Sequence, residues 1–145
     1  MNRSDHAVEM FLSGYNCAQS VLLSFSDDLK FSKELAQKMA AGFGGGMGKQ
    51  QETCGAVTGA IMVLGLLRGE AVNNNEELKS AAYTSVKDLV RDFTAAYKTT
   101  NCGELIGCDL NSAEGAAKFK EEKIQENICA GCVRKAVEIV EELTA

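Results

Sequence analysis

Cysteine is the residue type in this sequence best suited to chemistry, and the chain of 145 residues has six of them: Cys17, Cys54, Cys102, Cys108, Cys129 and Cys132. Cysteine thiolates act as nucleophiles and as ligands for soft metals. The first sixteen residues, MNRSDHAVEMFLSGYN, contain no apolar run typical of a secretory signal peptide, so we expect a cytoplasmic protein. Structural disulfides are rare in the cytosol, so this many thiols favours metal binding or redox chemistry.

Three of these thiols directly follow a residue that can cap a helix. The pairs are Asn16–Cys17, Thr53–Cys54 and Asn101–Cys102. A helix N-terminus carries unpaired N–H groups and about half a positive charge, which stabilises a thiolate. If the three helix starts converge, they would suit several thiolates or an anionic iron–sulfur cluster. The alternative for any single cysteine is a role as a small buried hydrophobe.

Small residues gather behind Cys54, where the sequence reads ETCGAVTGAIMVLG after the glycine-rich run GFGGGMG. Gly55 and Gly59 would let a cofactor approach the backbone, and close packing of two helices is the alternative explanation. The run itself does not fit a phosphate-binding loop, because Phe43 and Gln50 occupy positions that need glycine and Ser/Thr. We expect residues 42–48 to form a loop that wraps around the thiol site or serves as a turn.

The motif CAGC at residues 129–132 is the only CxxC of the chain. Such a pair can form a redox disulfide or supply two metal ligands. Val133 follows Cys132, so the motif is not a c-type haem site. With His6 as the only histidine, a bound metal would be held mainly by sulfur, which favours zinc, Cu(I) or iron–sulfur.

The elements that must position these thiols are predicted to be helices throughout, because apolar residues recur at helical spacing and no window alternates with the period of a strand. The 46% apolar content is that of a globular chain. We therefore predict an all-α protein, with residues 1–145 forming a single compact domain of about six or seven helices. The expected helices span residues 5–12, 17–29, 33–41, 54–67, 76–98, 102–107 and 127–143, with a polar segment over residues 112–125.

Composition also limits the partners. The net charge is −5 and no basic cluster is present, which argues against nucleic-acid binding. The longest apolar segment, residues 55–67, is shorter than the roughly 18 residues of a membrane span, so we expect no membrane insertion. The helix rich in glycine and alanine is compatible with a homodimer, although nothing in the sequence specifically supports one.

Taken in order, GYNCAQSV, GGGMG, ETCGAVTGAIMVLG, NCGELIGCDL and the late Cys132–Val133 resemble the C_GCAxxG_C_C family, whose members are described as redox-active. The resemblance covers nearly the whole chain. It implies that the four family cysteines correspond to Cys17, Cys54, Cys102 and Cys132, with Cys108 and Cys129 as extras and Cys129 as the alternative to Cys132. Related modules are similar to the cluster-bearing part of split-Soret cytochromes, which implies an iron–sulfur centre.

Three hypotheses follow. In the first, Cys17, Cys54, Cys102 and Cys132 ligate an iron–sulfur cluster or another thiophilic metal, and the protein passes electrons to an unknown redox partner. In the second, the protein is a thiol–disulfide enzyme that uses Cys129 with Cys132, or Cys102 with Cys108. In the third, it is a non-enzymatic helical module whose cysteines fill the core or hold structural zinc.

Overall fold

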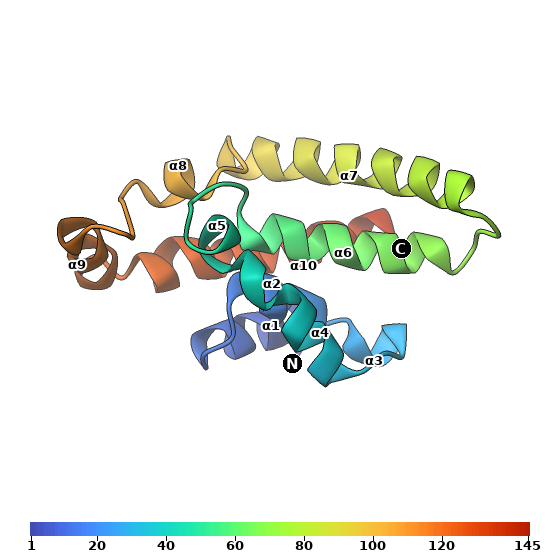
Figure 1. The fold of residues 1–145 in the computed structure, drawn as a ribbon, viewed down its shortest axis with the longest axis horizontal. Coiled ribbons are helices and arrows are strands. Elements are labelled where there is room, and N and C mark those ends of the chain that lie inside the picture. Colours follow the sequence, from blue (N-terminus) through green and yellow to red (C-terminus); the bar gives the residue numbers. More distant parts are fainter.

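The computed structural model describes residues 1–145 and is built from helices, as predicted. Three long helices form its main layer: α6 (Gly55–Gly69), α7 (Asn75–Tyr97) and α10 (Ala130–Leu143). In Figure 1 they lie side by side, with α6 and α10 running in one direction and α7 in the other. The N-termini of α6 and α10 therefore lie at the same end of this layer.

A second layer of shorter helices packs on one side of the long ones (Figure 1). It comprises α1 (Arg3–Leu12), α2 (Cys17–Leu23), α3 (Ser26–Leu29) and α4 (Lys33–Ala40). Helix α2 packs on α6, and α1 packs on α10. The two layers share one cluster of 24 buried residues, with Leu22, Leu64 and Val137 among those that solvent does not reach.

The remaining elements gather at the end of the long helices where α6 and α10 begin (Figure 1). They are η1 (Ala41–Phe43), α5 (Gly44–Met47), α8 (Cys102–Ile106), α9 (Ala113–Glu121) and a π-helical turn, η2 (Gln125–Cys129), which leads directly into α10. This end has its own small apolar cluster, formed by Cys102, Ile106 and Ile124. The cluster is separate from the main core, so the molecule has a seam between a large and a small packed region.

Three of the predicted helix starts are confirmed by their caps. The side chains of Asn16, Ser32 and Asn101 each accept a hydrogen bond from the backbone N–H three residues later. Asn16 also forms a full capping box, because its backbone N–H donates a hydrogen bond to the side-chain oxygen of Gln19. These caps depend only on local sequence, which is why they could be read from it.

The predicted count of six or seven helices is too low, because α3 and α9 are additional short helices. The expected helix over residues 17–29 divides into α2 and α3. The hydroxyls of Ser24 and Ser26 donate to the carbonyls of Val21 and Leu23 at this division. Such local hydrogen bonds compete with the helical pattern. Likewise Ser112 caps α9 within the segment expected to be only polar.

The glycine-rich segment is a left-handed turn and not an irregular loop. Residues 45–49 all have positive φ, and this run includes Met47 and Lys49 as well as three glycines. At Gly46 a side chain would collide, since a Cβ there would lie 2.6 Å from the Glu52 nitrogen and 2.7 Å from the Cys102 Cβ. Glycine is therefore needed at this position both for its φ and for space.

None of the helices combines the length and the apolar character that crossing a bilayer requires.

Candidate functional site

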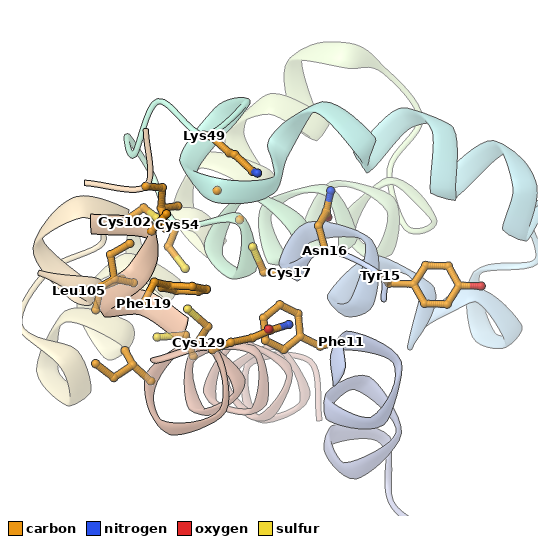
Figure 2. A pocket seen from close by; sticks show the side chains of 18 of the residues that line it. Phe11, Tyr15, Asn16, Cys17, Lys49, Cys54, Cys102, Leu105, Phe119 and Cys129 are labelled. Atoms are coloured by element: carbon orange, nitrogen blue, oxygen red, sulfur yellow. The ribbon is translucent and has the colours of Figure 1, made fainter. Parts of the chain in front are cut away.

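A cavity of about 530 Å³ lies where α6 and α10 begin, and five of the six cysteines line it. They are Cys17, Cys54, Cys102, Cys129 and Cys132. Figure 2 shows the sulfur atoms of Cys17, Cys54 and Cys129 pointing into a common space, whereas the ring of Tyr15 points away from it. Cys108 is not among the lining residues, and all six cysteines are free thiols.

Cys54 and Cys102 are brought together by a short antiparallel backbone pairing. Thr53 and Asn101 form an isolated β-bridge. The N–H of Cys54 donates to the Thr100 carbonyl at 2.7 Å, and the N–H of Cys102 donates to the Glu52 carbonyl at 2.6 Å. Two thiols that are 48 positions apart in sequence therefore share one wall of the cavity.

This pairing corrects the prediction that Thr53 caps a helix beginning at Cys54. Cys54 is itself the N-cap residue of α6, and the helix begins at Gly55. Because the backbone of Thr53 is engaged in the bridge, the helix starts one residue later than predicted. Cys17 and Cys102 do occupy the first helical positions of α2 and α8, as predicted.

Cys17 lies against the start of α6, at a point where only glycine leaves enough room. A Cβ placed on Gly55 would overlap the Cys17 Sγ, and it would lie 3.0 Å from the Phe43 carbonyl oxygen. Gly55 also lines the cavity. Gly59 does not line it; a Cβ there would lie 2.8 Å from the Ala18 carbonyl oxygen, so Gly59 serves the close approach of α2 to α6.

Cys129 and Cys132 reach the cavity from the start of the last helix. Cys129 ends the π-helical turn, and Cys132 lies in the first turn of α10. A π-helical turn is an uncommon element that occurs frequently at functional sites. The structure thus places both cysteines of the CAGC motif at the cavity, including Cys129, which the family pattern treats as an extra.

The cavity lies at the seam between the two apolar clusters. Cys54 and Cys132 belong to the main core, Cys102 belongs to the small cluster, and Cys129 packs against both. Cys54, Cys102 and Cys132 are buried, while Cys17 and Cys129 are partly exposed. Each side of the seam therefore contributes thiols to the same space.

Cys54 and Cys132 form a coupled pair in which the thiolate is favoured at Cys54. Hydrogen bonding from Cys132 lowers the pKa of Cys54 despite its burial. The amides of Ala56 and Val57 in the first turn of α6 act in the same direction, although neither makes a capping hydrogen bond of standard geometry. The pKa of Cys132 is raised by the same hydrogen bond and further by burial.

The other thiols at the cavity favour their protonated forms. Burial raises the pKa of Cys102 and of Cys129 to about 12, and neighbouring thiols contribute to both shifts. Burial, followed by repulsion from Cys54, also raises the pKa of Cys17, although the Gly45 amide opposes the shift by hydrogen bonding to its sulfur. Without a cation the site therefore favours one thiolate, and each further negative charge would be repelled by the first.

The donor set fits a thiophilic group. Sulfur ligands select zinc, Cu(I) and iron–sulfur clusters, and neither histidine nor a carboxylate lines the cavity. No three or more His, Cys, Asp or Glu side chains are grouped closely enough to hold a single metal ion. The sulfurs are distributed around the wall of a space that has room for a group of several atoms.

Sequence reasoning missed several residues of the site. Phe11, Phe119 and Gln125 line the cavity, and Lys49 lies at its rim. Phe119 comes from α9, which lies in the segment predicted to be polar. The available signal was Phe119 itself, together with the apolar Ala116 three positions before it.

Known proteins resemble this chain over most of its length. Residues 15–143 match the family described as "Putative redox-active protein (C_GCAxxG_C_C)". An uncharacterized protein of Archaeoglobus fulgidus is 27% identical over 141 residues, which cover 92% of this chain and 87% of that protein. No solved structure matches the chain. Because the family match spans most of the chain and includes all the cysteines that line the cavity, this protein belongs to the C_GCAxxG_C_C family of redox-active proteins.

Proposed function

We propose that the cavity holds an iron–sulfur cluster, with Cys17, Cys54, Cys102 and Cys132 as ligands, and that the protein transfers electrons. The observation that carries this proposal is the meeting of thiols from distant segments in one cavity. Such a group, when bound, would accept and donate single electrons. Cys129 lines the same cavity and is a further candidate ligand.

The chain supplies more than sulfur to this site. The amide of Gly45 hydrogen-bonds to Cys17, and the amides of Ala56 and Val57 favour the thiolate of Cys54. Hydrogen bonds to ligand sulfurs and limited solvent access are the features by which proteins tune such centres. Thirteen of the 19 lining residues are hydrophobic, so the wall restricts water around the thiols.

Repulsion between thiolates also supports the binding of a cation at this site. Neighbouring thiols oppose ionisation of Cys102 and Cys129, and only Cys54 has a lowered pKa. Metal ligation requires deprotonated thiols, and a positive metal centre would offset their mutual repulsion. The site therefore has a set of thiols that would ionise together only around a cation.

The test is purification without oxygen, followed by visible absorption spectroscopy and by assays of iron, zinc, copper and acid-labile sulfide. We expect a coloured protein with bound iron and sulfide, and loss of the chromophore in the Cys54→Ser variant. Cys108→Ser is the matched control, because Cys108 is a free thiol that does not line the cavity. A colourless, metal-free protein after anaerobic purification and reconstitution would refute the proposal.

A second candidate function rests on the presence of Cys54 and Cys132 at the same cavity, with Cys54 as the thiol whose pKa is lowered. In this alternative the Cys54 thiolate attacks a disulfide substrate and releases one substrate thiolate. Cys132, once deprotonated, then attacks the mixed disulfide, which releases the second substrate thiolate and leaves a Cys54–Cys132 disulfide. The substrate gains two electrons, and the protein dithiol is oxidised.

Mass spectrometry of alkylated peptides after exposure to a small disulfide would test this alternative. If this alternative is right, metal-free protein should form a Cys54–Cys132 disulfide. This pair is not one of those predicted from the sequence. Persistence of six alkylatable thiols after that exposure would argue against it.

A further inference from the structure

Most residues that line the cavity are apolar, and the cavity contains a single charge. Among the 19 lining residues, Lys49 is the only charged one. This is a distinctive environment in a chain whose net charge is −5. An anion that enters the cavity meets this ammonium group, and no carboxylate lines the cavity.

The backbone at Lys49 is held in place by contacts on both sides. Its carbonyl oxygen accepts a hydrogen bond from the Asn111 side chain at 2.8 Å. The neighbouring Gln51 donates to the Cys108 carbonyl at 2.7 Å and accepts from the Leu110 N–H at 2.9 Å. These bonds tie the left-handed turn to the segment that follows α8, so the position of Lys49 at the rim is fixed by long-range contacts.

The side chain of Lys49 lies over Gly45, and only glycine allows this. A Cβ on Gly45 would lie 2.8 Å from the Lys49 Cγ. Figure 2 shows the Lys49 side chain extending along the glycine-rich turn. The aliphatic part of the side chain is thus seated on the turn, while the residue as a whole is exposed.

The ammonium group of Lys49 has no partner within the protein. The ion pairs of the structure involve other lysines and arginines, namely Arg3, Lys33, Lys38, Lys79, Arg91 and Arg134. Its charge is therefore available to a molecule that enters the cavity.

Two aromatic residues from distant parts of the chain line the cavity. Phe11 comes from α1 and is buried, and Phe119 comes from α9 and is partly exposed. Leu105 and Ile128 extend this apolar surface. The volume of about 530 Å³ lies within the range of small-molecule sites, which combine apolar walls with a few polar groups that fix orientation.

We propose that the cavity binds a small molecule with an apolar body and an anionic group such as a carboxylate, with the anion at Lys49 and the apolar body between Phe11 and Phe119. The molecule would then lie beside the thiols. Its role as a reactant rests on the proposed redox function, whereas its binding does not. Lys49 is accordingly the residue that selects anionic over neutral ligands.

Fluorine NMR titration of the full-length protein as purified tests this proposal, with fluorophenylacetate as the probe and fluorophenylacetamide as its neutral counterpart. We expect native protein to bind the acid about three- to fivefold more tightly than the amide, the effect of one cation a few ångströms away in a solvated site. Lys49→Gln should remove this preference and leave binding of the amide unchanged. Lys49→Arg should retain the preference, and it should weaken as salt is added.

Lys30→Gln is the matched control, because Lys30 is also exposed, also has positive φ and does not line the cavity. It should leave both affinities unchanged. Equal binding of acid and amide, or a preference that survives in Lys49→Gln, would overturn the assignment of Lys49. Failure of both probes to bind would overturn the ligand site itself, whereas the metal proposal is tested separately by the iron and sulfide content after anaerobic purification and reconstitution.

Discussion

Replacement of Gly55 by alanine tests the construction of the thiol site directly. The added methyl group would overlap the sulfur of Cys17 and lie 3.0 Å from the Phe43 carbonyl oxygen and 3.2 Å from the Ala18 nitrogen. The sulfur belongs to a side chain that can rotate, but the other two atoms belong to the backbone. The substitution therefore forces α2 and the glycine-rich turn away from the start of α6.

The change in the free energy of unfolding expected for Gly55→Ala follows from two opposing effects. Overpacking of a tight contact costs about 1–3 kcal/mol, while alanine gains at most about 1 kcal/mol over glycine as a helix former. Gly55 is the first residue of α6, where the propensity gain is smallest, so we expect a net loss of about 1–3 kcal/mol in the free energy of unfolding. In a chain of this size the melting temperature should fall by about 3–4 °C for each kcal/mol.

Gly65→Ala provides the matched control on the same helix. A Cβ at Gly65 meets nothing within 4 Å, so only the propensity gain remains. We expect this variant to be more stable than native protein by about 0.5–1 kcal/mol. The two alanine variants should therefore change stability in opposite directions, although they make the same chemical change in one helix.

Urea unfolding of metal-free, reduced protein, followed by far-UV circular dichroism, gives both free energies. Iron content after anaerobic purification provides a second readout, since displacement of Cys17 should lower it in Gly55→Ala only. If Gly55→Ala and Gly65→Ala were equally stable, the Cys17 sulfur could not lie against the start of α6, and the geometry of the site would be wrong.

Two further predictions concern the glycine-rich turn and the alkaline limit of stability. Gly46→Ala should lower the free energy of unfolding by about 2–5 kcal/mol, because it combines left-handed strain with collisions at the Glu52 nitrogen and the Cys102 Cβ. At Gly48 the nearest neighbour of an added Cβ lies at 4.0 Å, so Gly48→Ala should lower it by about 1–2 kcal/mol from strain alone. Equal losses for the two variants in urea unfolding would contradict this prediction. Burial, together with neighbouring thiols, raises the pKa of Cys102 and Cys129 from 9.0 to about 12. Between those values the unfolded chain releases protons that the folded chain retains, so metal-free protein should lose about 1.4 kcal/mol per pH unit for each thiol. A stability that stays constant above pH 9.0 would show that these thiols ionise freely in the folded protein.

The parts of this structure that depend on local sequence could be predicted from it. The helical class follows from apolar periodicity, and the caps at Asn16, Ser32 and Asn101 follow from side chains that bond within three residues. The prediction that cysteines stand at helix starts succeeded at Cys17 and Cys102 for the same reason. Local hydrogen bonds need no knowledge of the rest of the chain.

The features that were missed depend on contacts between distant segments. The pairing of Thr53 with Asn101 is a single bridge, too short to show the alternation of a strand. Left-handed backbone at Met47 and Lys49 is unfavourable for these residue types, so nothing in their identity predicts it. In each case the tertiary structure overrides local preference, and both features lie at the cavity.

The same long-range contacts explain how the site keeps its shape. Thiols on either side of the seam face each other because backbone bonds join Cys54 to Thr100 and Cys102 to Glu52, and because Gln51 bonds to the segment after α8. None of these hydrogen bonds uses a sulfur atom. The walls of the cavity are therefore held by groups whose charge does not change when the thiols lose protons, bind a metal or are oxidised. Because the groups that hold the walls are separate from the sulfurs, a change of charge at the sulfurs requires little movement of the backbone that positions them. This separation would suit a redox site.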